Sequence, residues 1–491
     1  MIFRDWLKEL DYTLLQGSVD VETEDVIYDS RKAAPGKVFV AMKGIRVDGH
    51  SFIPQVLKAG VRVLVTERPV EEELKNSGLS EDELKQVTVV MVEEGRHALA
   101  LLSAARFDHP AKKLVMIGVT GTKGKTTTTH MIRAILLAAG KKVGMIGTTG
   151  TVIGDVVTPT LNTTPESYEL HQAFAQMVEA GCEYAVMEVS SQGIKMHRTD
   201  GLYFNYAIFT NISPDHIGPG EHADFEEYLY YKTRLLNMCG IGLVNKDDEH
   251  APQIIKAANC ELYTYSEESK EADFVASDIR YVSQPDFVGT EFHISGKYDM
   301  EVRLGIPGLF NVVNALAAVS VCSFLGLDQA RISHALENIR VNGRMEIVYT
   351  SERCTVLVDY AHNAVSMESL LSTLRDYKPK RLVCVFGCGG NRSKDRRYSM
   401  GEIGGKMADL SIITADNSRY EKVEDIIADI RGSIEKTGGK FIEIPDRREA
   451  IRYSILHAQP GDMVAVIGKG HEDYQEINGV RHHFLDREVI E

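Results

Sequence analysis

The stretch Leu114-Val-Met-Ile-Gly-Val-Thr-Gly-Thr-Lys-Gly-Lys-Thr-Thr127 determines how the middle of this chain folds. Its first residues, Leu114 to Ile117, form the continuous apolar run expected of a strand that is buried on both faces of a parallel sheet. A glycine-rich turn follows and leads into a predicted helix that ends at Ala139, just before Gly140. Strand, glycine-rich turn and helix in this order predict a phosphate-binding loop.

This loop carries the residue types that phosphate binding needs. Its glycines let backbone N–H groups approach phosphate oxygens, and the helix N-terminus adds partial positive charge. Lys125 is expected to reach the β- and γ-phosphates of ATP, and Thr126 to place a hydroxyl on Mg²⁺. Val119 stands where the strict motif has its first glycine, so an ordinary strand–helix turn is the alternative. The predicted nucleotide contacts are Gly121, Thr122, Lys123, Gly124, Lys125, Thr126 and Thr127.

The alternation of strands and helices continues on both sides of the loop. Strands are predicted at 184–189 and 206–210, and helices starting near Thr164-Pro165-Glu166 and spanning 225–238. The pattern restarts around Val341, which indicates an α/β fold with doubly wound parallel sheets. The three predicted domains are an N-terminal α/β module (1–110), a central phosphate-loop domain (111–341) and a C-terminal Rossmann-like domain (342–491).

Composition excludes several classes of protein. A chain of 491 residues is too long for one hydrophobic core. Its net charge of −15 argues against nucleic-acid binding, because duplex binders usually present a basic face. Seven scattered cysteines are typical of reduced thiols in a cytoplasmic protein. Without a signal-peptide pattern or an apolar run of bilayer-spanning length, we expect a cytoplasmic location and no membrane partner.

Two polar motifs follow predicted strands of the central domain. Glu188 lies at the end of one strand, and Asp215-His216 follows the next. Because the carboxyl ends of parallel strands meet at one edge of a sheet, a carboxylate and an imidazole there could hold Mg²⁺ beside a triphosphate. Either residue alone is more often an ordinary surface or hydrogen-bonded group.

The sequence closely resembles the Mur ligases through nearly the whole chain. Thr120-Gly-Thr-Lys-Gly-Lys-Thr-Thr127 is similar to that family's short phosphate loop. Asp29-Ser-Arg31 and Asp48-Gly-His-Ser-Phe-Ile53 resemble its nucleotide-sugar module. Asn162-Thr-Thr-Pro165 resembles its muramoyl-substrate loop. The resemblance implies that these segments and the residues after Glu188 bind the substrate through Ser30, His50, Thr163, Thr164, Ser190 and Arg198.

Lys232 is spaced like the family lysine that becomes carbamylated. The addition of CO₂ to a neutral amine gives an anionic oxygen ligand, which suits Mg²⁺. An ordinary helix lysine in a salt bridge is the alternative. The resemblance implies that Lys125, Glu188, His216 and Lys232 are catalytic, and that the metal ligands are Thr126, Glu188, His216 and carbamylated Lys232.

The C-terminal domain adds two further groups by the same resemblance. The segments Gly343-Arg-Met-Glu346 and Asp359-Tyr-Ala-His-Asn363 resemble the family's ATP contacts, which implies nucleotide binding by Arg344, Asp359 and Asn363. The residues implied for the incoming amino acid are Arg392, Asp416, Asn417, Arg419, Gly468 and Glu472.

The implied activity is an ATP-dependent amide ligase of peptidoglycan precursor synthesis, a monomer that joins a free amino acid to UDP-N-acetylmuramoyl-L-Ala-D-Glu through an acyl phosphate. The guanidinium of Arg419, with Arg392, suits the distal carboxylate of meso-diaminopimelate better than the ammonium of L-lysine. Ser418, Gln192 and Met196 depart from the family pattern, which keeps L-lysine and a different acyl acceptor as alternatives.

Two more distant alternatives are a folylpolyglutamate-synthetase-like ligase and a non-catalytic nucleotide-dependent scaffold. The nucleotide-sugar segments at 29–53 and the pair Arg392 and Arg419 argue against the first. The second is disfavoured because a binding module would not need the two-metal set of Lys125, Glu188, His216 and Lys232.

Overall fold

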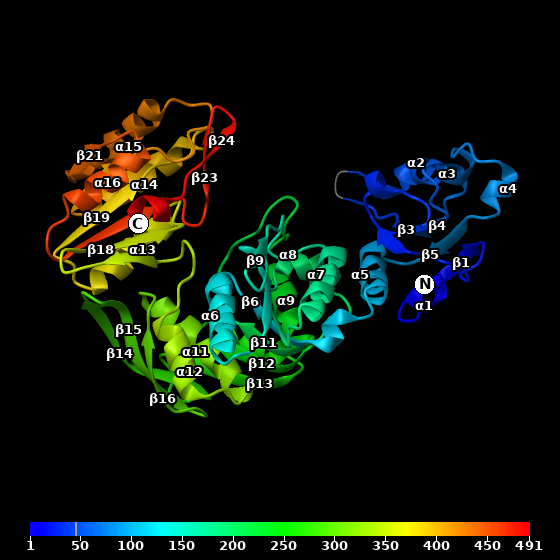
Figure 1. Cartoon of the computed structure of the whole chain (residues 1–491), viewed down its shortest axis with the longest axis horizontal. Coiled ribbons are helices and arrows are strands. Elements are labelled where there is room, and N and C mark those ends of the chain that lie inside the picture. Colours follow the sequence, from blue (N-terminus) through cyan, green and yellow to red (C-terminus); the bar gives the residue numbers. More distant parts are fainter. Residues whose placement is uncertain (45–46) are drawn as a thin grey trace. The chain divides into compact units, whose positions relative to one another are not determined.

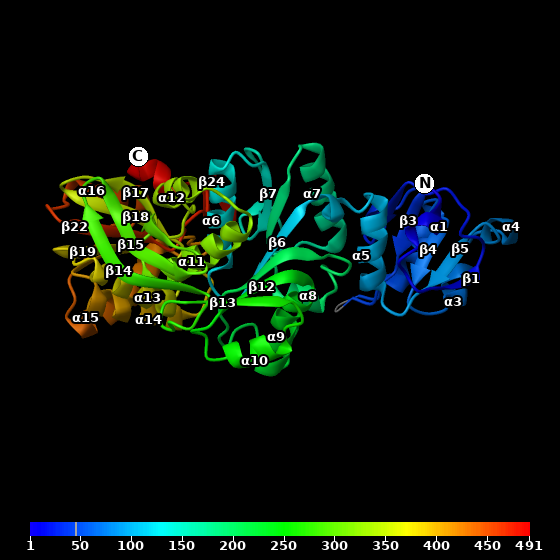
Figure 2. The same ribbon diagram turned by 90° about the horizontal axis from the view of Figure 1, so that it is seen from below.

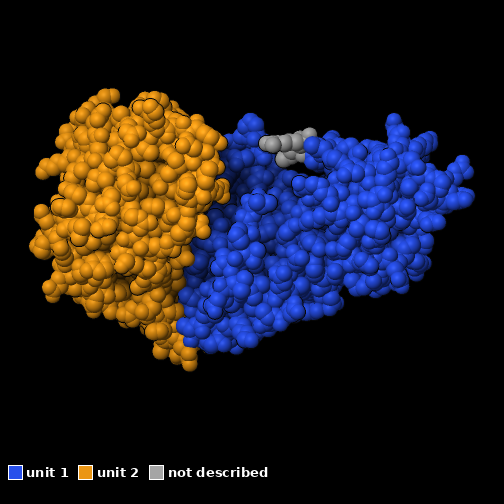
Figure 3. All heavy atoms as spheres, turned by 45° about the horizontal axis from the view of Figure 1, so that its top comes forward, with its two compact units in different colours: residues 1–265, 320–322 blue, residues 266–319, 323–491 orange. Residues whose placement is uncertain are grey.

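The computed structural model describes residues 1–44 and 47–491, which form two compact units. The first unit holds residues 1–265 and 320–322, and the second holds residues 266–319 and 323–491 (Figure 3). Both units combine helices with largely parallel sheets (Figure 1). The predicted α/β fold class is therefore confirmed.

The N-terminal part of the first unit is built on a five-stranded sheet. Its elements are α1 Phe3–Trp6, β1 Thr13–Gln16, β2 Asp25–Ile27, β3 Lys37–Val40, α2 Ile53–Lys58, β4 Val63–Thr66, α3 Glu71–Lys75, α4 Glu81–Leu84, β5 Thr88–Met91 and α5 Gly95–Arg106. The strand order is β1-β5-β4-β3-β2, with only β1 antiparallel to its neighbour. The apolar face of α5, including Ala98, Leu99 and Leu102, packs onto the sheet valines and closes this core.

The central part of the first unit is a larger, mainly parallel sheet. Its elements are β6 Val115–Thr120, α6 Lys125–Ala138, β7 Val143–Gly147, β8 Gly150–Ile153, β9 Val156–Thr158, α7 Ser167–Glu179, β10 Tyr184–Glu188, α8 Ser191–Lys195, β11 Phe204–Phe209, α9 Phe225–Thr233, β12 Cys239–Asn245, α10 Ala251–Ala257 and β13 Glu261–Ser266. From β13 the order runs β12-β11-β6-β10-β7 in parallel, and then β8 and β9 add an antiparallel edge. The carboxyl ends of β6, β10 and β11 therefore meet at one edge, where ligands bind in such sheets.

The local predictions for this sheet hold with two exceptions. The run after Leu114 is a strand that is buried on both faces, as expected. Helix α7 begins at Ser167 and not at Thr164, because the Thr164 hydroxyl bonds the Glu188 carbonyl and keeps that residue in the loop. The helix predicted to reach residue 238 ends at Thr233 and continues as a 3₁₀ turn. The hydroxyl of Thr233 bonds the Leu229 carbonyl, a back-bond that disfavours regular helix.

Helix α5 of the N-terminal part lies beside α7 of the central part (Figures 1 and 2). Polar contacts join the two parts: the Tyr28 hydroxyl donates to Glu169 Oε1 at 2.9 Å, and the Tyr168 hydroxyl to Asp25 Oδ1 at 3.1 Å. Burial beside Glu169 raises the pKa of the Tyr28 hydroxyl, so the phenol stays protonated as a donor. The N-terminal module is thus held on the central sheet by hydrogen bonds as well as by packing.

The second unit begins with an antiparallel segment that the sequence analysis did not predict. Its elements are β14 Phe274–Gln284, β15 Phe287–Gly296, β16 Met300–Leu304, α11 Leu309–Phe324 and α12 Gln329–Glu337. The hairpin of β14 and β15 continues into β16, and α12 packs against β16. Burial alternates along β15 from Thr290 to Ile294, which is the pattern of a strand covered on one face.

The C-terminal part of the second unit is a six-stranded sheet. Its elements are β17 Glu346–Thr350, β18 Cys354–Asp359, α13 Ala364–Asp376, β19 Arg381–Phe386, α14 Lys394–Met407, β20 Leu410–Ile413, α15 Val423–Thr437, β21 Phe441–Glu443, α16 Arg447–Leu456, β22 Asp462–Ile467, a hairpin of β23 Tyr474–Ile477 and β24 Val480–His483, and α17 Asp486–Ile490. The order is β17-β18-β22-β19-β20-β21, parallel except for β17. The loops after β18, β19, β20 and β22 share one edge.

A buried ion pair stabilises the strand ends at that edge. Arg447 and Asp486 are both fully buried, with 2.7 Å between the Arg447 Nη2 and Asp486 Oδ2 atoms. The same guanidinium donates to the carbonyls of Ala415, at 3.3 Å, and Ile467, at 3.0 Å. One side chain therefore holds two strand ends in place.

Candidate functional site

The phosphate loop joins β6 to α6 and adopts a backbone that only glycine allows at one position. Gly121 has a φ of 144°, and a Cβ atom there would lie 1.9 Å from the Thr210 hydroxyl. The Nζ atom of Lys125 donates to the carbonyls of Gly121, at 2.8 Å, and Thr122, at 3.1 Å. The lysine is thus held over the loop, at the N-terminus of α6.

A residue that the sequence analysis missed fixes the loop from the neighbouring strand. The side chain of Asn211, just after β11, accepts from the Lys123 N–H at 2.9 Å and donates to the Lys123 carbonyl at 3.0 Å. Its backbone carbonyl accepts from the Thr122 N–H at 2.8 Å. An asparagine at the end of the strand next to the loop is the signal that could have identified it.

Glu188 lies at the end of β10 with 1% of its surface exposed. Its Oε1 atom accepts from the Thr126 hydroxyl at 3.0 Å and from the Thr148 N–H at 2.9 Å. At Gly147 a Cβ atom would lie 2.3 Å from the same oxygen, so only glycine leaves room for this carboxylate. Two of the four predicted metal ligands, Thr126 and Glu188, are therefore in direct contact.

Lys232 is buried, with 2% of its surface exposed, on α9. Its Nζ atom donates to the Gly121 carbonyl at 2.7 Å and lies 4.6 Å from the centre of the Tyr228 ring. Among the described residues, this amine forms no ion pair with a carboxylate. Burial, together with the nearby Lys125 charge, lowers the pKa of the Lys232 amine well below its ordinary value. The buried environment thus shifts the protonation equilibrium of Lys232 toward the neutral amine.

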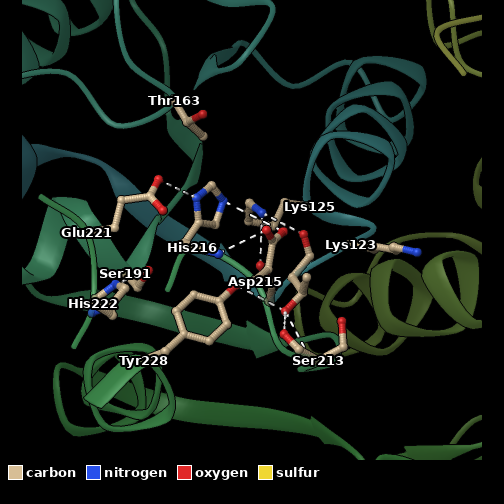
Figure 4. A network of polar contacts seen from close by, with 12 residues as sticks. Lys123, Lys125, Thr163, Ser191, Ser213, Asp215, His216, Glu221, His222 and Tyr228 are labelled. Atoms are coloured by element: carbon tan, nitrogen blue, oxygen red, sulfur yellow. Dashed lines mark hydrogen bonds and ion pairs between the residues drawn. The ribbon is translucent and has the colours of Figure 1, made fainter. Parts of the chain in front are cut away.

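His216 lies on the loop after β11, among the polar side chains drawn in Figure 4. Its ring is half exposed: Nδ1 is 3.1 Å from Glu221 Oε1, and Nε2 is 3.8 Å from Asp215 Oδ2. Among the residues that the structure describes, His216 makes no contact with Glu188. Of the four predicted metal ligands, Thr126 and Glu188 are joined by a hydrogen bond, while His216 contacts Glu221 and Lys232 donates to the Gly121 carbonyl.

The predicted acceptor residues line the loops beside Glu188. The Thr163 and Thr148 hydroxyls are 3.1 Å apart, and the Thr164 hydroxyl accepts from the Ser190 N–H at 2.9 Å. Ser190 caps α8 by accepting from the Gly193 N–H. Arg198 donates to the Thr164 carbonyl at 3.0 Å, which ties the two predicted substrate segments together.

The two predicted contacts of the N-terminal module differ in their surroundings. Ser30 begins a short 3₁₀ turn that Asp29 caps, and its side chain is partly exposed. His50 is 1% exposed: its Nδ1 atom is 2.6 Å from Asp48 Oδ1, and its Nε2 atom accepts from the Glu67 N–H at 3.1 Å. Both ring nitrogens of His50 therefore serve the fold of the module.

In the second unit the predicted nucleotide residues surround the start of β17 and the end of β18. Asp359 accepts from the N–H groups of Met345 and Ala361, both at 2.8 Å. Burial raises the pKa of its carboxyl despite these bonds. The Arg344 guanidinium lies 5.2 Å from the centre of the Tyr360 ring. Asn363 caps α13 through the Ser366 N–H, so its side-chain oxygen already has a structural role.

The predicted amino-acid residues converge at the edge of the C-terminal sheet. Asn417 donates to Glu472 Oε2 at 3.0 Å, and at Gly468 a Cβ atom would lie 2.8 Å from Asp416 Oδ2. Arg419 donates to the Gly390 carbonyl at 2.7 Å. Arg392 is exposed on the adjoining loop.

Two further residues complete this cluster: Lys469, which lies in the predicted segment Gly468–Glu472, and Glu476, which was not predicted. The fully buried Lys469 lies 3.3 Å from both the Asn417 side-chain oxygen and Glu472 Oε2. Glu476 on β23 lies 3.6 Å from the Arg419 guanidinium, and its N–H donates to Asn417 at 2.9 Å. The position of Lys469 between the predicted contacts Gly468 and Glu472 is the sequence feature that marks it.

The chain matches models of a known protein family over most of its length. Three family models match: "Mur ligase family, catalytic domain" over residues 23–107, "Mur ligase middle domain" over 119–322, and "Mur ligase, glutamate ligase domain" over 343–470. A relative from Caldanaerobacter subterraneus subsp. tengcongensis, named UDP-N-acetylmuramoyl-L-alanyl-D-glutamate–2,6-diaminopimelate ligase, is 39% identical over 99% of this chain and 97% of its own. The chain belongs to the Mur ligase family.

Other Mur ligases support the assignment. The Clostridium perfringens protein of the same name is 38% identical over 100% of this chain and 99% of its own. A solved structure with that name has 30% sequence identity and a TM-score of 0.73, and the match covers 95% of this chain and 94% of that one. A folylpolyglutamate synthase of Mycobacterium tuberculosis, at 18% identity and a TM-score of 0.57, shares the fold alone.

Among the described residues, no helix is long and apolar enough to cross a membrane.

Proposed function

We propose that this Mur ligase adds meso-diaminopimelate to UDP-N-acetylmuramoyl-L-Ala-D-Glu, with conversion of ATP to ADP and phosphate. The terminal carboxylate of the acceptor attacks the γ-phosphorus of ATP, and ADP leaves. The amine of the incoming amino acid then attacks the acyl phosphate, and phosphate leaves. The observation that carries the proposal is that Lys125 of the phosphate loop and the buried Lys232 both donate to the Gly121 carbonyl.

The residues of the first unit fit ATP and Mg²⁺. The loop from Gly121 to Thr127 presents backbone N–H groups at the N-terminus of α6, which suits phosphate oxygens. Thr126 and Glu188 offer a hydroxyl and a carboxylate, and Mg²⁺ prefers oxygen ligands of this kind. Bound Mg²⁺ would neutralise charge that builds on the transferring phosphoryl group. Lys125 adds a positive charge on the same side.

The environment of Lys232 favours carbamylation. A neutral amine can attack the carbon of CO₂; one proton leaves, and the product is a carbamate anion. The lowered pKa of Lys232 increases the neutral fraction of its amine, and the new carboxylate would bring negative charge close to Lys125. His216 would join it as a ligand by giving up its present contact with Glu221.

Lys232→Ala tests this part of the proposal. We expect turnover to fall and to recover in part when a small carboxylic acid such as acetate is added, because the acid replaces the missing carboxylate. Lys256→Ala, at a lysine near the end of α10, is the matched control and should retain full activity without acetate. Loss of activity without any recovery would argue for a plain lysine.

Arg419 supports the choice of diaminopimelate. Its guanidinium lies on the edge of the C-terminal sheet and now donates to the Gly390 carbonyl, a partner that a substrate carboxylate could replace. Such a charge-assisted pair contributes about 1.5–3 kcal/mol. Arg419→Gln should therefore raise the KM for diaminopimelate roughly 10- to 150-fold. Arg431→Gln, at an exposed arginine paired with Glu443, is the control.

The decisive experiment offers diaminopimelate and L-lysine in parallel. The purified protein is incubated with ATP, Mg²⁺ and the UDP-linked dipeptide, and phosphate release is read together with product mass. Tripeptide formed with diaminopimelate supports the proposal, and product with lysine alone keeps the ligase activity but overturns the specificity. ATP binding without either product would direct attention to a different acceptor.

We also propose that the ligase works in the cytoplasm as a monomer. All seven cysteines are free, which is typical of proteins from a reducing compartment. Size-exclusion chromatography with light scattering should give the mass of one chain, 54.6 kDa. A stable dimer would contradict this.

A further inference from the structure

Two histidines and one aspartate meet where the N-terminal part of the first unit contacts the central part. His97 is on α5, while His197 and Asp200 follow α8. The Nδ1 atoms of His97 and His197 lie 2.6 Å and 2.8 Å from the same atom, Asp200 Oδ2. One potential ligand atom from each residue lies within 4.8 Å of the others. Within residues 1–44 and 47–491 no other group of three such side chains is this close.

The cluster is accessible to an ion. The exposed fractions of the side chains are 44% for His97, 40% for His197 and 23% for Asp200. The two rings stand edge to face, with 6.3 Å between their centres, so both can turn a nitrogen toward one point. None of the three residues takes part in the phosphate-loop site.

The backbone at His197 is held in an uncommon conformation. Its φ is 55°, in the left-handed region that non-glycine residues seldom adopt. Hydrogen bonds on both sides of the turn maintain it: the His197 N–H donates to Ile194 at 3.0 Å, and the Arg198 N–H to Gly193 at 2.8 Å. The turn therefore presents the imidazole toward Asp200 in a fixed direction.

We propose that His97, His197 and Asp200 bind one Zn²⁺ ion. Two imidazole nitrogens and one carboxylate oxygen are ligands that Zn²⁺ takes readily, with water in the fourth position. The same set suits Mg²⁺ poorly, because that ion prefers an octahedral shell of oxygens. The site is thus chemically distinct from the oxygen ligands offered by Thr126 and Glu188.

The geometry needs only a small adjustment. Ligand atoms about 2.1 Å from a tetrahedral ion are about 3.4 Å apart. The present separations of 2.6 Å and 2.8 Å are those of direct hydrogen bonds, so the side chains must open by roughly 0.7 Å. Half-exposed side chains can make that movement by small rotations, without a change in the backbone.

The bound ion would join two parts of the chain. It would link α5 to the turn that carries Arg198, which already shares Glu166 with Arg96 of α5. Arg198 lies 2.7 Å from Glu166, and Arg96 lies 3.4 Å from it. Zn²⁺ would therefore fix the N-terminal module against the segment that carries a proposed acceptor contact.

The competing interpretation is a metal-free clamp, in which Asp200 simply accepts one hydrogen bond from each histidine. Both interpretations join the same elements. They differ in whether the full chain takes up one transition-metal ion with these three side chains as ligands, which metal titration measures directly.

The test is a titration of the metal-free, full-length protein with Co²⁺, followed by its visible absorption and by displacement with Zn²⁺. We expect saturation at one Co²⁺ per chain, with the strong absorption of a tetrahedral complex. His97→Gln and Asp200→Asn each remove one ligand and should weaken binding by at least roughly tenfold, since changes even to the residues around metal ligands cost 10- to 100-fold. His457→Gln, at an exposed histidine that stacks on Tyr453, should leave the titration unchanged.

A second measurement tests whether the bound ion links α5 to the turn that carries Arg198. The only tryptophan, Trp6, is buried in the N-terminal core, so its fluorescence follows the unfolding of that module. Zn²⁺ should raise the temperature of this transition in the wild type but not in the two ligand variants, whose folding is checked by circular dichroism. Wild-type protein that binds no Co²⁺, or binds it as weakly as both variants do, would overturn the proposal.

Discussion

Asp486→Asn should destabilise the C-terminal part of the second unit severely, although it changes only one atom. Both members of the Arg447–Asp486 pair are fully buried, so the substitution leaves an uncompensated guanidinium away from water. Breaking a buried pair in this way costs about 3–5 kcal/mol. The Arg447 guanidinium also holds the carbonyls of Ala415 and Ile467, directly before Asp416 and Gly468. We therefore expect weaker amino-acid binding as well.

Hydrogen exchange read by mass spectrometry is the suitable assay, because Trp6 lies in the other unit and unfolding of a multidomain chain is not two-state. Amides of β22 that exchange only when this part unfolds should exchange roughly 150- to 4,000-fold faster, at tenfold per 1.4 kcal/mol. Peptides from β6, in the first unit, serve as the internal reference.

Two further variants make the reasoning refutable. Arg447→Met combined with Asp486→Leu replaces both charges by apolar groups and should restore most of the protection, since such replacements are often neutral. Glu449→Gln breaks an exposed pair with Arg452 on the same helix and should change exchange less than about fivefold, in keeping with at most 1 kcal/mol. If the β22 amides are as well protected from exchange in Asp486→Asn as in Glu449→Gln, the buried pair does not stabilise this part.

Three other substitutions have defined outcomes. Gly147→Ala would place a Cβ atom 2.3 Å from Glu188 Oε1 and displace that carboxylate. Because hydrogen bonds of Glu188 are lost, the rate of phosphate release should fall roughly 10- to 150-fold. Gly432→Ala, where the Cβ atom meets nothing within 4 Å, is the control and should leave the rate unchanged. Asn211→Ala removes two hydrogen bonds to the phosphate loop and should raise the KM for ATP more than it lowers kcat; an unchanged KM would contradict the assigned role. His171 is 2% exposed and neither ring nitrogen has a partner among the described residues, so burial lowers its pKa to about 3. Below about pH 6.5 only the unfolded chain takes up that proton, so stability should fall by up to about 1.4 kcal/mol per pH unit, and urea denaturation of His171→Leu should lose this slope.

The parts of the fold that the sequence predicted are those in which local pattern and tertiary structure agree. The apolar run after Leu114 could only be a strand with two covered faces, and the glycines after it require a tight turn. The hairpin of β14 and β15 was missed because its polar face, with residues such as Arg280 and Glu291, breaks the continuous apolar pattern that was used for the parallel strands. Helix α9 ended early because of a side-chain hydrogen bond that periodicity does not reveal.

The candidate site was predictable where the signal is a motif in one segment. Lys125 and Glu188 lie at the sheet edge that the strand order requires. Asn211 was missed because its role depends on β11 lying next to β6, which the sequence does not state. The contact of His216 with Glu221 could not be predicted either, because it depends on the conformation of an exposed loop. The meeting of His97 with His197 depends on how two parts of a unit pack, and no local pattern encodes it.

The contacts of Lys125 have a consequence for how the nucleotide arrives. In the free enzyme the Lys125 ammonium already donates hydrogen bonds to two loop carbonyls, and these bonds stabilise the conformation of the loop. ATP must exchange for these bonds and not merely add to them, which makes the heat of binding smaller than the number of new contacts suggests. In return the loop loses little freedom when ATP binds, because it is ordered beforehand. Calorimetry of nucleotide binding should accordingly show a modest enthalpy with a small entropic penalty.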